Sequence, residues 1–95
     1  MKIEVSGTNI NISGNIKSVS DFQNIKENLD KIIDSNKNIT INITDSLSIT
    51  SSVIGYLNKL VLHDGIHINM NISNEQLLVL LNDLNLSSTF NVRKA

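Results

Sequence analysis

The residues best placed for chemistry are three adjacent hydroxyls, Thr50, Ser51 and Ser52. An apolar stripe at helical spacing follows them, so they should lie at a helix N-terminus. Such an end presents unpaired N–H groups and a partial positive charge, which favour an anion such as a phosphoryl group. Plain N-capping of the helix is the simpler interpretation of the same hydroxyls.

Other kinds of site find less support in the sequence. A serine nucleophile needs a base, and neither His63 nor His67 is expected near Ser51. Gly65 turns the chain between the two histidines, so a shared metal ion is not implied, and the four glycines are isolated rather than gathered in a phosphate-binding loop. Asp45 follows a strand, where open α/β sheets bind ligands, but a turn-forming role fits it better. We therefore predict no catalytic residue, no metal ligand and no cofactor.

A strand and a helix must position the three hydroxyls. Residues 38–44 alternate isoleucine with asparagine and threonine, which predicts a strand with one buried side. The helix after Thr50 should bury a stripe that runs from Val53 to Val61. Gly65 lies just beyond its last turn and is a typical helix stop.

The flanking segments carry similar signals. Residues 2–6 and 9–13 alternate around Gly7-Thr8, which predicts a hairpin. A helix with a stripe from Phe22 to Ile33 should begin at a capping box with Ser20 as the cap and Gln23 three residues later.

After Gly65 we expect a strand over residues 66–72 and a second capping box, with Ser73 as the cap and Gln76 as its partner. The helix behind it should end near Asn85. A last short strand is expected over residues 89–92, followed by a tail.

The predicted order is therefore β-β-α-β-α-β-α-β. Strand–helix–strand crossovers give parallel neighbours, so the sheet should be mixed and mostly parallel. A parallel sheet covered on both faces has strands that are apolar throughout, whereas these strands are apolar on one side only. We predict an α/β fold of the two-layer sandwich type, with the helices on one face of the sheet.

Composition limits the classes of function. Ninety-five residues form one domain, residues 1–95, and the net charge of −1 with three scattered aromatics argues against a nucleic-acid-binding surface. The chain has no cysteine, which excludes disulfides and cysteine-ligated metals. Its longest apolar run, Leu77 to Leu81, is too short to span a bilayer. The first residues read as a strand and not as a signal peptide, so a cytoplasmic protein is expected.

Three segments together with the element order resemble the STAS domain, the fold of bacterial anti-sigma-factor antagonists. Members commonly carry Asp-Ser-Ser-Gly or a variant between a strand and a helix, and Thr50-Ser51-Ser52-Val53-Ile54-Gly55 occupies that place. Thr50 and Val53 stand where the family usually has aspartate and glycine. Residues 73–78 and 90–92 resemble the last helix and short strand of the family.

The resemblance implies a non-catalytic regulatory module that binds a protein partner, and the partner class it suggests is an anti-sigma factor that is a serine kinase. The family's phosphate acceptor falls on Ser51, or on Ser52 if the match shifts by one residue. The exposed side of the helix should include Tyr56, Lys59 and His63. Because a partner would cover the helix N-terminus and the loop before it, the expected contact residues are Asp45, Ser46, Ser48, Thr50, Tyr56 and Lys59. Two alternatives remain, a constitutive accessory subunit of a transporter or other complex, and, with less support, a small ligand-binding domain or enzyme.

Overall fold

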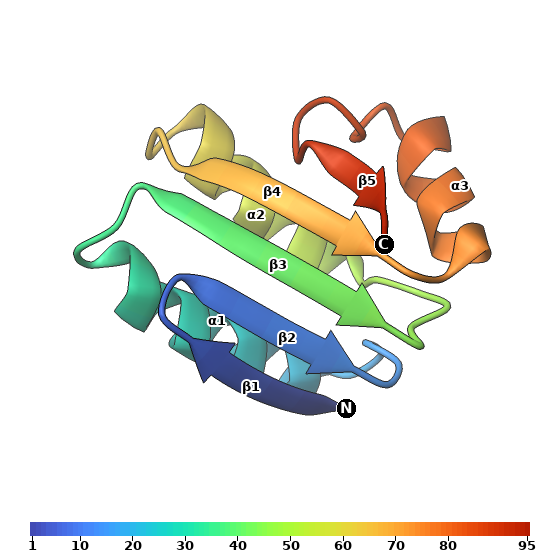
Figure 1. The fold of residues 1–95 in the computed structure, drawn as a ribbon, viewed down its shortest axis with the longest axis horizontal. Helices are drawn as coiled ribbons and strands as arrows, with labels where there is room; N and C mark the ends of the chain where they lie inside the picture. Colours follow the sequence, from blue (N-terminus) through green and yellow to red (C-terminus); the bar gives the residue numbers. More distant parts are fainter.

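The protein is an α/β domain with one five-stranded mixed sheet and three helices, described by a computed structural model over Met1–Ala95 (Figure 1). The elements follow the predicted order β-β-α-β-α-β-α-β. Their bounds are β1 (Lys2–Ser6), β2 (Asn9–Ser13), α1 (Val19–Ile33), β3 (Asn38–Thr44), α2 (Ser51–Leu62), β4 (His67–Ile72), α3 (Glu75–Asp83) and β5 (Val92–Lys94). None of the three helices has the length and apolar character needed to cross a membrane.

The strands lie in the sheet in the order in which they occur in the chain, β1-β2-β3-β4-β5. β1 and β2 form an antiparallel hairpin, and every later neighbour is parallel. Gly7 has a φ of 61° at the first position of the two-residue hairpin turn, which is the place where a type II′ turn requires glycine.

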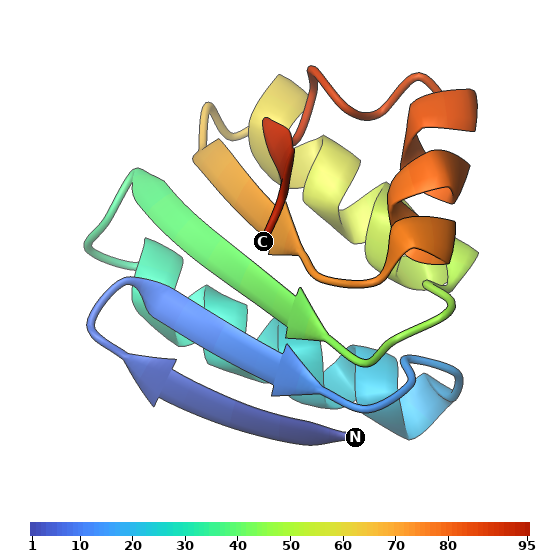
Figure 2. The same ribbon diagram turned by 45° about the vertical axis from the view of Figure 1, so that its right-hand side comes forward.

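The alternating strands bury one side only. The core contains Ile39, Ile41, Ile43, Ile68 and Met70 together with the inner stripes of the helices. In Figure 1 the sheet lies in front of α1 and α2, α3 lies beside β5, and no helix covers the face turned to the viewer. Figure 2 shows the same arrangement turned by 45°. The helices therefore lie on one face of the sheet, as predicted.

The uncovered face carries a row of hydrogen-bonded asparagines. The Asn42 amide donates to Asn11 Oδ1 in β2, and the Asn71 amide donates to Asn42 Oδ1, each at 2.8 Å. The parallel register places these three side chains opposite one another on neighbouring strands. An amide both donates and accepts, so a row of asparagines can link three strands without help from another residue type.

Two predicted helix caps are wrong by one or two residues. α1 is capped by Ser18 and not Ser20: the Asp21 N–H donates to Ser18 Oγ at 3.0 Å, and the Ser18 N–H donates to the Asp21 carboxylate at 3.2 Å. α3 is capped by Asn74, whose Oδ1 accepts from the Leu77 N–H, and Ser73 instead donates to the Ile43 carbonyl. In both places several polar residues compete for the cap, and the backbone conformation at the entrance to the helix decides among them.

The last strand also lies later than predicted. β5 begins at Val92, because Asn91 takes a left-handed conformation, with φ 48°, and its amide donates to the Ile68 carbonyl at 3.0 Å. The expected tail residue Lys94 therefore belongs to β5 and forms an ion pair with Glu75 at 2.9 Å.

Candidate functional site

The N-terminus of α2 is capped by Thr50. Its Oγ1 accepts a hydrogen bond from the Val53 N–H at 3.3 Å, and its carbonyl accepts from the Ile54 N–H at 3.1 Å. Thr50 has an extended backbone, with φ −82° and ψ 155°, as a cap residue requires. One of the three candidate hydroxyls is thus committed to the helix itself.

Ser51 and Ser52 are the first two residues of α2, as predicted, and both are exposed. Neither hydroxyl forms a hydrogen bond within the chain, because Thr50 already provides the cap. The first turn carries no acidic side chain that would offset the positive end of the helix dipole. Both serines therefore present a free hydroxyl beside a weakly positive helix end.

The loop before α2 is fastened to the loop after β2. The Ser46 hydroxyl is fully buried; it donates to the Ser48 carbonyl at 2.6 Å and accepts from the Ile16 N–H at 3.2 Å. Ser48 Oγ donates to the Ile16 carbonyl at 3.0 Å, and the Leu47 N–H donates to Asn15 Oδ1 at 2.8 Å. The three bonds to Asn15 and Ile16 join residues about thirty positions apart in the chain and hold the loop in one place.

Sequence reasoning did not identify Asn15 and Ile16 as partners of this loop. Asn15 reads locally as a turn residue, and nothing in its neighbourhood signals the contact with Leu47. Asp45 lies at the start of the same loop, exposed and with φ 61°. This left-handed conformation is one that aspartate tolerates better than most residues, and it fits the turn-forming role.

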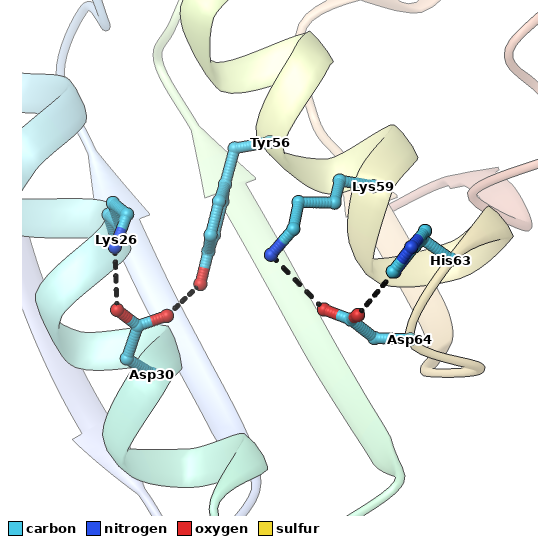
Figure 3. A network of polar contacts seen from close by, with 6 residues as sticks. All are labelled: Lys26, Asp30, Tyr56, Lys59, His63 and Asp64. Carbon is cyan, nitrogen blue, oxygen red and sulfur yellow. Dashed lines mark hydrogen bonds and ion pairs between the residues drawn. The ribbon is translucent and has the colours of Figure 1, made fainter.

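Tyr56 was expected on the exposed side of α2, and that expectation is wrong. Its side chain is 8% exposed, and its hydroxyl donates to Asp30 Oδ1 in α1 (Figure 3). The ring of Phe22 meets the Tyr56 ring edge-on at 6.2 Å, and the Lys26 ammonium lies 5.5 Å from the ring centre. Tyrosine is large and apolar except at its tip, so it fills the space between two helices once a carboxylate accepts from its hydroxyl.

The bond between Tyr56 and Asp30 shifts the pKa of both groups. Burial raises the pKa of Tyr56 above its ordinary value, and the hydrogen bond to the Asp30 carboxylate raises it further. Burial by itself would also raise the pKa of Asp30. The hydrogen bond from Tyr56 and the ion pair with Lys26 at 2.9 Å outweigh that effect and lower the pKa of Asp30.

Lys59 is exposed on α2, as expected for a contact residue. Its ammonium lies 3.5 Å from the Asp64 carboxylate. The same carboxylate lies within hydrogen-bonding distance of His63 Nδ1, at 3.1 Å (Figure 3). The hydrogen bond from His63 and the charge of Lys59 lower the pKa of Asp64. His67 lies on the uncovered face of β4 instead, and no group of three or more His, Asp or Glu side chains gathers anywhere in the chain.

The structure thus brings six of the predicted contact and acceptor residues to one end of the sheet: Asp45, Ser46, Ser48, Thr50, Ser51 and Ser52. Ser46 lies inside that end of the molecule and the two serines lie on its surface. Tyr56 faces α1, and Lys59 lies further along the exposed side of α2. No family model matches the chain, and neither a curated protein nor a solved structure gives a significant match.

Proposed function

We propose that the protein is a non-catalytic regulatory module of the STAS type, which docks on a protein partner through the start of α2 and the loop before it. The partner class is an anti-sigma factor with serine-kinase activity, and the switch is phosphorylation of Ser51 or Ser52. The observation that carries the proposal is the pair of exposed hydroxyls, without hydrogen-bond partners in the chain, at the first two positions of α2.

The surroundings of the two serines support a docking role. The loop over residues 45–50 is held by side-chain bonds to Asn15 and Ile16, so a partner would meet a preformed surface. Leu47 in that loop is 49% exposed, which offers an apolar anchor next to the hydroxyls. Gly55 lies one turn further along the exposed side of α2, and the place that a Cβ would take is open, so a partner's backbone could come close.

The switch would act through charge. A phosphoryl group adds roughly −1.5 to −2 charge at neutral pH. The helix end favours that charge in the free protein, since no acidic side chain opposes it in the first turn. A partner that covers the same surface would bury the charge without a counter-ion, which costs several kcal/mol. Phosphorylation would therefore release the partner while leaving the domain folded.

The test begins with the partner. Affinity capture on the purified protein from its native cell, followed by mass spectrometry, identifies it. Calorimetric titration of that partner should show binding weakened about a hundredfold or more by Ser51→Asp or Ser52→Asp, since ~3 kcal/mol corresponds to that factor. The alanine variants of both serines should bind as the wild type does.

A matched pair of apolar variants locates the docking surface. Leu47→Ala should weaken the complex, whereas Leu62→Ala, which truncates an even more exposed leucine at the far end of α2, should not. Equal affinity for the wild type, both aspartate variants and both alanine variants would reject the phospho-switch. With Leu47→Ala still weakening the complex, that result would favour the constitutive accessory subunit, a role with which threonine at position 50 and valine at position 53 agree.

A further inference from the structure

The outer edge of β1 is free along its whole length. β1 is the first strand in the sheet order, so it pairs with β2 on one side only. Figures 1 and 2 show no helix or loop beside its other edge. A strand edge of this kind presents unpaired N–H and C=O groups that can pair with another strand.

The hydrogen-bond pattern shows which backbone groups of β1 face outward. At the two ends of β2, the Gly14 N–H donates to the Thr44 carbonyl and the Thr8 carbonyl accepts from the Thr40 N–H. The backbone N–H and C=O groups of the even-numbered residues of β2 therefore face β3. The odd residues of β2 must therefore bond to β1, where they lie opposite Lys2, Glu4 and Ser6. Ile3 and Val5 are left with N–H and C=O groups that point away from the sheet.

The side chains of the same strand alternate between charged and apolar. Lys2 and Glu4 lie on the uncovered face, where their side chains form an ion pair at 3.1 Å and are 73% and 65% exposed. Ile3 and Val5 lie on the helix side, and Val5 is 46% exposed because no further strand covers it. The edge thus offers one row of opposite charges and one row of apolar side chains.

We propose that the protein forms a homodimer in which β1 pairs antiparallel with β1 of a second copy, centred on Ile3. Ile3 then faces Ile3 of the second copy, and the two residues exchange both backbone hydrogen bonds. Lys2 of each copy lies opposite Glu4 of the other, and Val5 lies opposite Met1. The strand is complementary to itself in both its charges and its apolar side chains.

The other two-fold registers lose this match. Centring the pair on Glu4 would place the two Glu4 carboxylates directly opposite each other, which is destabilising. Centring it on Val5 would place Glu4 opposite Ser6 and move Lys2 past the end of the partner strand, opposite Thr8 in the hairpin turn. Charge complementarity therefore selects the register centred on Ile3.

The helices leave room for this dimer. α1 contacts both β1 and β3, so it lies over β2 between them. In the paired sheet the two β2 strands would be three strand spacings apart, about 14 Å. Packed helices need about 8–10 Å between their axes, so the two α1 helices would not collide. The start of α2 lies at another part of the molecule and stays open in the dimer.

Charge reversal tests the pairing. Sedimentation velocity over a concentration series should show a monomer–dimer equilibrium for the wild type, weakened by salt because the charge pairs are exposed. Lys2→Glu and Glu4→Lys each replace two attractive pairs by two repulsive ones and should weaken the dimer about tenfold or more. The double variant restores both pairs in reverse and should recover the wild-type equilibrium. Lys37→Glu, an exposed site between α1 and β3 with the same change in net charge as Lys2→Glu, should not alter it.

Cross-linking tests the register, and the chain has no cysteine of its own to interfere. In the proposed dimer the two copies of residue 3 lie about 5.5 Å apart between Cα atoms, within disulfide range. Those of residue 5 lie about 14 Å apart. Under oxidising conditions Ile3→Cys should give a covalent dimer, and Val5→Cys should not.

Three outcomes overturn the proposal. The first is a wild-type protein that stays monomeric at protein concentrations up to about 1 mM. The second is a dimer that both single reversals leave unchanged. The third is cross-linking of Val5→Cys in preference to Ile3→Cys, which would mean that the edge pairs in another register. None of these outcomes depends on the fate of Ser51 or its partner.

Discussion

Thr50 holds the start of α2, so it should matter more to stability than the serines that follow it. Thr50→Ala removes the acceptor for the Val53 N–H and should lower the free energy of unfolding by about 0.5–2 kcal/mol. Ser51→Ala, which breaks no hydrogen bond, should change it by less than about 0.5 kcal/mol. Urea denaturation of the two variants measures both values. A larger loss for Ser51→Ala than for Thr50→Ala would mean that Ser51 is the cap.

Tyr56 should make stability depend on pH in the alkaline range. Its pKa is raised in the folded protein, so its contribution is complete below the ordinary tyrosine pKa of about 10 and is lost as the pH rises toward the folded value. The free energy of unfolding should therefore fall more steeply above about pH 10 in the wild type than in Tyr56→Phe.

The measurement of that effect is direct, because Tyr56 is the only tyrosine and the chain has no tryptophan. Near-ultraviolet absorbance then reports the ionisation of this one side chain. The folded protein should ionise at a higher pH than the protein in denaturant. Coincident titration curves in the two conditions would contradict the buried hydrogen bond to Asp30.

At the scale of the elements, the asparagine row should stabilise the three central strands. Asn42 bonds to a neighbour on either side, so Asn42→Ala should cost about 1 kcal/mol. Asn69 lies on the same face of the sheet, in β4, and its side chain forms no hydrogen bond within the chain. Asn69→Ala should therefore cost less than about 0.5 kcal/mol. Parallel denaturation curves of the two variants provide the comparison, and equal losses would show that the row does not stabilise the sheet.

At the scale of the whole molecule, Ser46 joins two loops that the chain order separates by α1 and β3. Ser46→Ala leaves the Ile16 N–H and the Ser48 carbonyl without a partner in a buried position, and should cost about 1–3 kcal/mol. Ser52→Ala, on the exposed start of α2, is the matched control and should be nearly neutral. Thermal unfolding distinguishes them; a neutral Ser46→Ala would mean that water or another group replaces its hydroxyl without loss.

The alternation of isoleucine with polar residues was enough to predict β2, β3, β4 and the single covered face, and the apolar stripes of the helices completed the element order. When every second residue is apolar, a strand has one buried and one exposed side whatever it packs against, so the signal can be read from a short segment alone. The position of Ser51 and Ser52 at the start of α2 was predictable for the same reason. The exact caps at Ser18, Thr50 and Asn74 were not, because neighbouring polar side chains offer similar local bonds.

Three features needed the tertiary structure. Ser46 bonds to Ile16, and Leu47 to Asn15, only because the loops after β2 and β3 lie at the same end of a parallel sheet. Tyr56 is buried because α1 packs beside α2 and presents the Asp30 carboxylate to its hydroxyl, whereas its position on the helix alone suggested exposure. The free outward edge of Ile3 and Val5 follows from the place of β1 at the end of the strand order. Each depends on which elements become neighbours, and neighbours far apart in the chain leave no local signal in the sequence.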